Sequence, residues 1–240
     1  MAEQAVPPVP PQPRALIFDV DGTLAETEEL HRRAFNETFA AHGLDWHWTK
    51  ADYRRLLKVT GGKERIAAHA TAIGGDLAGL DIPALHLAKT ARYGALMAAG
   101  EITLRPGVQA LIDAARASGL RLAIATTTSR PNVEALAQTV WGASAGAVFD
   151  VIACGDEVAA KKPAPDIYVL ALHRLGLPPG RAIAFEDSRN GLQSARSAGL
   201  TVIVTPSAYT GDEDFTGAFR VLDNLSQLPA IAGLRIMPEA

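Results

Sequence analysis

Near its N-terminus the chain reads Ala15-Leu16-Ile17-Phe18-Asp19-Val20-Asp21-Gly22-Thr23-Leu24. The apolar run 15–18 predicts a buried strand over 14–18, which ends just before two carboxylates spaced two residues apart. Open α/β sheets bind ligands at the carboxyl ends of their strands. Two like charges this close repel each other unless a cation or a shared proton stabilises them. Asp19 and Asp21 therefore indicate a Mg²⁺-assisted site in which one carboxylate performs chemistry; a simple turn built from Asp and Gly is the alternative.

The composition is typical of a globular protein, since 48% of the 240 residues are hydrophobic and 20% are charged. A net charge of −3 shows no excess of basic residues, so no nucleic-acid partner is expected. Nothing in the sequence indicates an obligate protein partner. No apolar run approaches the roughly 18 residues of a membrane span, so no membrane association is predicted. The single Cys154 fits a reducing compartment, which predicts a cytoplasmic protein with Cys154 in the core rather than acting as a nucleophile.

Apolar strand patterns alternate with helical patterns along most of the chain. After the first strand, further strands are predicted at 121–125, 148–153, 182–185, 201–204 and 219–222. Strands that alternate with amphipathic helices are typical of a parallel sheet covered on both faces. The predicted fold class is therefore α/β, with a Rossmann-like parallel sheet as its core.

The interval between the first two strands is much longer than the roughly 30 residues of a βαβ unit. Its pattern is helical, with helices predicted at 28–42, 49–58, 63–73 and 82–99. We therefore expect an inserted all-helical cap domain.

The predicted cap domain covers residues 28–98, and the α/β core consists of 14–27 and 99–240. Residues 1–13 hold five prolines and are expected to form a flexible tail, with a proline-rich ligand for a partner domain as the alternative.

Polar residues follow three more of the predicted strands. Thr126 and Thr127 begin a run of hydroxyl residues before a helix, which favours phosphate binding as well as helix capping. Lys162 can neutralise a nucleophilic carboxylate and a phosphoryl oxygen, although lysines in loops are usually solvated. Glu186 and Asp187 offer the hard oxygen ligands that Mg²⁺ prefers. Acids at two strand ends strengthen the prediction of a metal site.

Two groups in the predicted cap are candidates for substrate binding. Gly62 lets a loop approach a ligand, and Lys63 and Arg65 can take a second phosphate; a solvated helical turn is the alternative. Glu28 and His31 lie at the junction with the core, where an acid can accept hydrogen bonds from sugar hydroxyls, although acidic first turns are also common. Tyr53 either faces the cleft, which we favour by resemblance, or packs inside the cap.

The four motifs, in this order, resemble those of the haloacid dehalogenase-like hydrolase superfamily, and the helical insertion resembles the cap of its β-phosphoglucomutase-like branch. This resemblance implies that Asp19 is the nucleophile and Asp21 the general acid and base. It implies that Thr126, Thr127 and Lys162 hold the phosphoryl group. It also implies that Mg²⁺ is the cofactor, bound by four residues: Asp19, Asp21 through its backbone carbonyl, Glu186 and Asp187.

Residues 21–36 and 60–65 look like the corresponding stretches of CbbY-type phosphatases. These enzymes remove a phosphate from xylulose-1,5-bisphosphate, an inhibitory side product of Rubisco in the Calvin cycle. The resemblance implies a phosphoric monoester hydrolase that forms an aspartyl phosphate and acts on a small-molecule sugar phosphate. A β-phosphoglucomutase-type mutase and a phosphoglycolate phosphatase are the alternatives. A non-catalytic binding module would be expected to lack one of Asp19, Asp21, Lys162 or Asp187, and none is missing.

Overall fold

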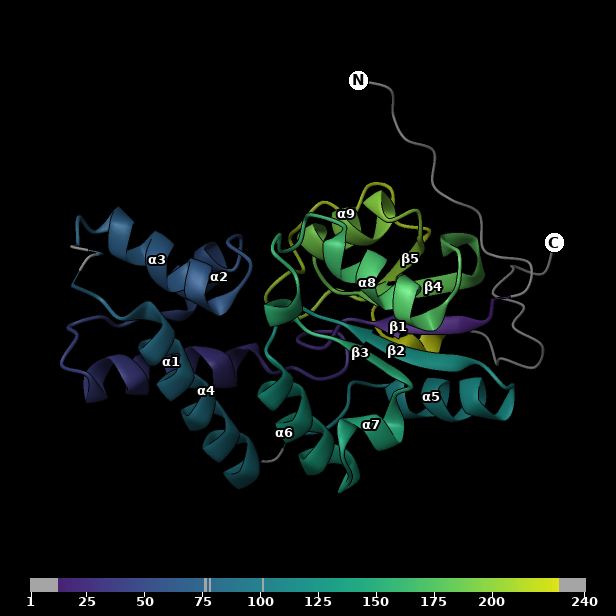
Figure 1. Cartoon of the computed structure of the whole chain (residues 1–240), viewed down its shortest axis with the longest axis horizontal. Coiled ribbons are helices and arrows are strands. Elements are labelled where there is room, and N and C mark those ends of the chain that lie inside the picture. Colours follow the sequence, from purple (N-terminus) through teal and green to yellow (C-terminus); the bar gives the residue numbers. More distant parts are fainter. Residues whose placement is uncertain (1–12, 76, 78, 101, 229–240) are drawn as a thin grey trace.

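The computed structural model describes residues 13–75, 77, 79–100 and 102–228, so the predicted tail lies almost wholly outside the described residues. Its core is one parallel sheet with the strand order β3-β2-β1-β4-β5-β6 (Figure 1). The strands are β1 Ala15–Phe18, β2 Arg121–Ala125, β3 Val151–Ala153, β4 Ala182–Glu186, β5 Thr201–Val204 and β6 Arg220–Val221. The predicted Rossmann-like α/β fold is therefore confirmed.

The third strand is shorter than the sequence predicts. The apolar stretch at its start forms a helical turn, α7 (Ala145–Val148), and the strand begins only at Val151. Ala145, Val148 and Phe149 are all buried in the core, so the apolar character of this stretch reflects burial rather than strand geometry. Short apolar runs do not distinguish the two.

Helices cover both faces of the sheet, as Figure 1 shows. One face carries α5 (Val108–Ala117), α6 (Arg130–Trp141) and α7, and the other carries α8 (Asp166–Leu175) and α9 (Arg189–Ser197). Successive residues of β1 point to opposite sides, so that Leu16 and Phe18 join one apolar cluster while Ala15 and Ile17 join the other. Short 3₁₀ turns occupy Gly155–Glu157, Pro179–Arg181 and Leu225–Gln227.

The described residues between β1 and β2 form five helices, and the first four of them, α1–α4, make a separate group at the left of Figure 1. They are α1 (Glu28–Ala41), α2 (Lys50–Leu56), α3 (Gly62–Ala72) and α4 (Ile82–Ala99). These helices enclose an apolar cluster of their own, formed by Phe35, Phe39, Trp48, Tyr53, Ile66 and Leu85. Within the described residues, no helix combines the length and hydrophobicity that a membrane crossing requires.

The chain enters and leaves this helical group through two adjacent segments. Ala25 forms an antiparallel bridge with Leu104, which places the outgoing and incoming segments side by side. Arg105 fixes the junction because its guanidinium donates hydrogen bonds to the backbone carbonyls of Gly22 and Pro206. The junction therefore lies next to the end of β1, where Asp19 and Asp21 are found.

Candidate active site

The site forms where the strand order reverses. β1 lies between β2 and β4, so the carboxyl ends of these three strands meet at one edge of the sheet. In doubly wound sheets this switch point is where ligands bind. Asp19 follows β1, Thr126 follows β2, and Asp187 follows β4. The parallel sheet thus brings together residues that are far apart in the sequence.

A buried lysine joins two of the acids. The Nζ atom of Lys162 lies 2.6 Å from Asp19 Oδ1 and 2.6 Å from Glu186 Oε1. Burial alone would lower the pKa of Lys162, but Asp19 and Glu186 raise it above its ordinary value, so the ammonium stays charged. Burial raises the pKa of Asp19 to about 7, although Lys162 opposes the shift. The single positive charge of Lys162 does not balance the negative charges that Asp19, Glu186 and Asp187 carry when they are ionised.

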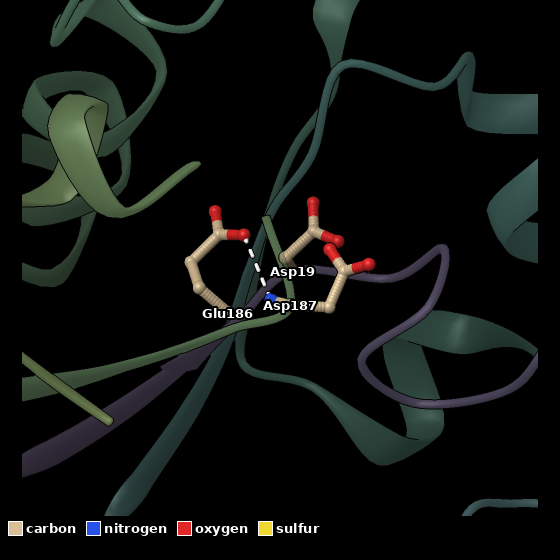
Figure 2. A group of neighbouring side chains, drawn as sticks. All are labelled: Asp19, Glu186 and Asp187. Carbon is tan, nitrogen blue, oxygen red and sulfur yellow. Dashed lines mark hydrogen bonds between the residues drawn. The ribbon is translucent and has the colours of Figure 1, made fainter. Parts of the chain in front are cut away.

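Figure 2 shows the acids of this cluster, Asp19, Glu186 and Asp187, at the end of the sheet. Each offers a carboxylate oxygen, and these atoms lie within 4.8 Å of one another. Burial, followed by the charges of Asp19 and Glu186, raises the pKa of Asp187 well above its ordinary value. A side chain at Gly22 would overlap the Asp187 carboxylate, so glycine is required there. Oxygen ligands with unbalanced negative charge fit a hard divalent cation such as Mg²⁺.

Asp21 points toward the helical group rather than toward the other acids. Its Oδ1 accepts hydrogen bonds from the Thr27 hydroxyl and, at 3.0 Å, from His31 Nε2. Lys89 Nζ lies 2.6 Å from His31 Nδ1, which places a neutral imidazole between an ammonium and a carboxylate. Burial alone would raise the pKa of Asp21, but His31, Thr27 and Lys89 lower it to about 2.

The hydroxyl run lies in the pocket beside these groups. Thr126 is buried, and its Oγ1 accepts a hydrogen bond from the backbone N–H of Thr128 at 3.1 Å. Gly155 packs so closely on Thr127 that a side chain at this glycine would overlap the Thr127 backbone. The loop is therefore held by neighbouring backbone, and Thr126 and Thr127 line the same pocket as Asp19.

One pocket is lined by both the sheet edge and the helical group. From the sheet edge come Asp19, Asp21, Thr126, Thr127, Lys162 and Asp187, and from the helices come Glu28, His31, Gly62, Lys63 and Arg65. Of the site residues predicted from the sequence, Glu186 and Tyr53 are not in the lining. Glu186 is fully buried behind Lys162, which it contacts directly.

Tyr53 does not face the cleft, contrary to the sequence-based prediction. It is fully buried in the aromatic cluster of the helical group, next to Phe35 and Trp48. Its hydroxyl donates a hydrogen bond to Glu28 at 2.8 Å and accepts one from Arg65 at 3.2 Å. Tyr53 is not among the residues that line the pocket, and it lies behind residues that do, among them Glu28 and Arg65.

The cations predicted to hold a second phosphate have protein partners. Lys63 Nζ lies 3.0 Å from Asp156 Oδ1, in an ion pair that links α3 to the loop after β3. Arg65 donates to the carbonyl of Leu56 as well as to Tyr53. An anionic ligand would therefore compete with Asp156 for Lys63.

Among the pocket residues that sequence reasoning missed are Lys89, His86 and Asp156. Lys89 and His86 lie within a regular helix and belong to no motif, and Asp156 lies in a short turn after β3 that belongs to none of the four motifs. The ring of His86 occupies the space where a side chain at Gly62 would lie, which explains the glycine sterically. Only the fold reveals these neighbours.

A family model for haloacid dehalogenase-like hydrolases matches residues 13–199. The chain therefore belongs to the haloacid dehalogenase-like hydrolase family, and it is an enzyme of the phosphoric monoester hydrolase class.

The chain also has close relatives. It is 61% identical to protein CbbY of Rhodobacter capsulatus over 89% of this chain and 94% of that protein. It is 60% identical to protein CbbY of Cereibacter sphaeroides, over 92% and 96% respectively. The resemblance to CbbY proteins is thus confirmed.

Solved structures show the same similarity to CbbY proteins. The crystal structure of CbbY from Rhodobacter sphaeroides with phosphate matches with a TM-score of 0.90 and 60% identity, covering 93% of this chain and 99% of that one. A variant of that protein in complex with xylulose-1,5-bisphosphate matches with the same TM-score, at 59% identity and the same coverage. A β-phosphoglucomutase from Clostridium difficile, at 21% identity and a TM-score of 0.76, covers 91% of this chain and 94% of its own, and shares the fold.

Proposed function

We propose that this enzyme is a Mg²⁺-dependent sugar-phosphate phosphatase whose substrate is xylulose-1,5-bisphosphate, so that it removes this Rubisco inhibitor in the Calvin cycle. The observation that carries the proposal is the solved CbbY relative, 59% identical, that binds this bisphosphate. The pocket supports it because acids and Lys162 lie at one end and Lys63 and Arg65 contribute at the helical side.

Asp19 and Asp187, with Glu186 and the backbone carbonyl of Asp21, would hold the Mg²⁺. When bound, the cation offsets the repulsion between the carboxylates and the phosphoryl oxygens and stabilises the charge of the transition state. Lys162, Thr126 and the backbone of Thr127 would hold the phosphoryl oxygens. Preorganised donors of this kind supply much of the catalysis in phosphoryl transfer.

Asp19 acts as the nucleophile in this proposal. Its carboxylate forms a bond to phosphorus while the bond to the sugar oxygen breaks, which produces an aspartyl phosphate. Water then attacks that phosphorus and restores the Asp19 carboxylate with release of phosphate. A covalent route of this kind divides one difficult displacement into two easier steps.

Asp21 acts as the general acid and base. It donates a proton to the departing sugar oxygen and takes one from the attacking water. In the structure His31 and Lys89 favour the ionised form of Asp21, which suits the second step. A bound phosphate brings further negative charge and raises the pKa of Asp21, which favours the protonated form that the first step requires.

The helices α1–α4 would act as a cap, with 28–98 as the cap domain and 14–27 with 99–240 as the core. Glu28 and His31 would contact sugar hydroxyls, Gly62 would leave room for the ligand, and Lys63 and Arg65 would bind the phosphate that is not cleaved.

The test is release of inorganic phosphate from xylulose-1,5-bisphosphate, xylulose-5-phosphate, β-glucose-1-phosphate and 2-phosphoglycolate, with and without Mg²⁺. We expect the highest kcat/KM with the bisphosphate, no turnover after chelation, and no turnover by Asp19→Asn. Formation of glucose 6-phosphate without phosphate release would instead identify a mutase. A preference for 2-phosphoglycolate would overturn the assignment of a bisphosphate substrate.

A further inference from the structure

Tyr168 lies on α8 behind the active-site lysine, on the side away from the pocket. It is fully buried, and its hydroxyl donates a hydrogen bond of 2.5 Å to Glu186 Oε1. The same oxygen accepts the 2.6 Å hydrogen bond from Lys162 Nζ. The Lys162 ammonium also lies 5.1 Å from the centre of the Tyr168 ring. Tyr168 thus contacts both members of the Lys162–Glu186 pair.

The carboxylate of Glu186 is held by hydrogen bonds at both of its oxygens. Oε1 accepts from Tyr168 and Lys162, and Oε2 faces the backbone N–H of Asp187 at 3.3 Å. Gly191 at the start of α9 packs against this carboxylate so closely that a side chain there would overlap it. The position of Glu186 is therefore set by α8 and α9 together, and Tyr168 donates a side-chain hydroxyl hydrogen bond to it.

Lysine side chains are flexible, and a single contact does not hold an ammonium in one place. Lys162 is held by Asp19, by Glu186 and by the face of Tyr168. In the proposed reaction Asp19 becomes phosphorylated, and its contact with Lys162 then changes. Glu186 and Tyr168 do not form or break bonds in the proposed reaction. Their contacts with Lys162 therefore stay the same throughout it.

We infer that Tyr168 is a positioning residue: its hydroxyl fixes Glu186, and through Glu186 it holds the Lys162 ammonium against the phosphoryl site. The inference rests on the proposed phosphatase mechanism but not on the identity of the sugar. Misplacement of a catalytic group by about 1 Å can lower the rate by about 10²-fold. The hydroxyl should therefore affect turnover although it never touches substrate.

The test is Tyr168→Phe, which removes the hydroxyl and retains the ring beside Lys162. We expect kcat with 4-nitrophenyl phosphate to fall about tenfold, since a displaced charged donor costs roughly this much. The matched control is Ser194→Ala, which removes a buried hydroxyl that donates to the carbonyl of Ala164, in the same loop as Lys162. The control should lower the melting temperature with kcat within twofold of wild type.

A double-mutant cycle separates positioning from a general structural role. If Tyr168 acts through Glu186, Tyr168→Phe should lower kcat little or not at all further in a Glu186→Gln background. Unchanged kcat in Tyr168→Phe, a loss equal to that of Ser194→Ala, or fully additive losses would overturn the inference. 4-Nitrophenyl phosphate serves as substrate so that a wrong sugar assignment, which would show in the sugar-phosphate assay alone, does not affect this result.

Discussion

The sheet edge and the helical group contribute to one pocket in different ways, which two buried lysines illustrate. Lys162, at the sheet edge, contacts two carboxylates, which raise its pKa. Lys89, on α4, contacts His31 and no carboxylate among the described residues, and burial lowers its pKa to about 7. The sheet edge therefore carries a stable charge at a fixed position, whereas burial in the helical group disfavours the charged form of Lys89.

The same difference extends to the contacts of the other site residues. Residues at the sheet edge are fixed by strands that pair in register, so their geometry follows from the fold. Lys63 is instead held by a partly exposed ion pair with Asp156, and such pairs are weak. We infer that the sheet edge determines the chemistry and the helices determine which substrate is accepted, which substitutions on each side can test.

The largest effect is expected from Asp21→Asn, which removes the proposed acid and base and leaves the fold intact. General acid–base catalysis typically contributes about 10²–10⁴-fold, so kcat should fall by that range for every substrate. Steady-state kinetics with a bisphosphate and a monophosphate would check this. A loss confined to the bisphosphate would mean that Asp21 acts in recognition, and the division between the two regions would fail.

Asp187→Asn should weaken Mg²⁺ binding, because the cation loses one of its proposed ligands. Loss of an outer-shell partner already costs about 10–100-fold in metal affinity, so a direct ligand should cost at least about 100-fold. Calorimetric titration with Mg²⁺ measures this without reference to activity. Equal affinity in wild type and Asp187→Asn would place the metal elsewhere.

On the helical side, Lys63→Ala should raise KM for the bisphosphate about tenfold, since a charge-assisted hydrogen bond is worth about 1.5–3 kcal/mol. The KM for a monophosphate should stay the same. Lys58→Ala is the matched control, because this exposed lysine carries the same charge but does not line the pocket.

Asp156→Asn should act in the opposite direction to Lys63→Ala. It frees Lys63 from its ion pair and should lower KM for the bisphosphate. A fall in kcat for all substrates in Lys63→Ala would contradict its assignment to recognition.

The smallest effect concerns stability and pH. The pKa of Lys89 is about 7 in the folded protein and near its ordinary value of 10.5 after unfolding. Between these values the unfolded chain binds one more proton, so the free energy of unfolding should rise with pH across this window. Lys89→Met should remove this rise, as urea unfolding at pH 7 and pH 9 would show. An equal pH dependence in both proteins would mean that folding does not lower the pKa of Lys89.

Much of the sheet could be predicted from the sequence because each strand is a short, fully apolar run. β2 and β5 begin and end where the patterns predict, β1 begins one residue later, and β4 extends one residue further. The acids and Lys162 could be placed at one edge because parallel strands end on the same side. The predicted start of β3 was wrong because the residues before Val151 are apolar as a result of burial, not because they form a strand.

The helical side of the pocket could not be predicted in the same way. Its contacts join residues far apart in sequence, such as Lys89 with His31 and Lys63 with Asp156, and no local pattern encodes them. Tyr53 was wrongly placed because an aromatic residue with a polar hydroxyl suits both a cleft and an apolar cluster. Tyr168 gave no signal, since a helical tyrosine is unremarkable until its hydroxyl is found on Glu186.

The bridge between Ala25 and Leu104 has a consequence for the history of such enzymes. Everything between these two positions could be lengthened, shortened or exchanged without disturbing the strand order, because the chain departs and returns at one point. Related enzymes can therefore evolve specificity for another metabolite through changes in this insertion alone, while the catalytic residues of the sheet stay the same.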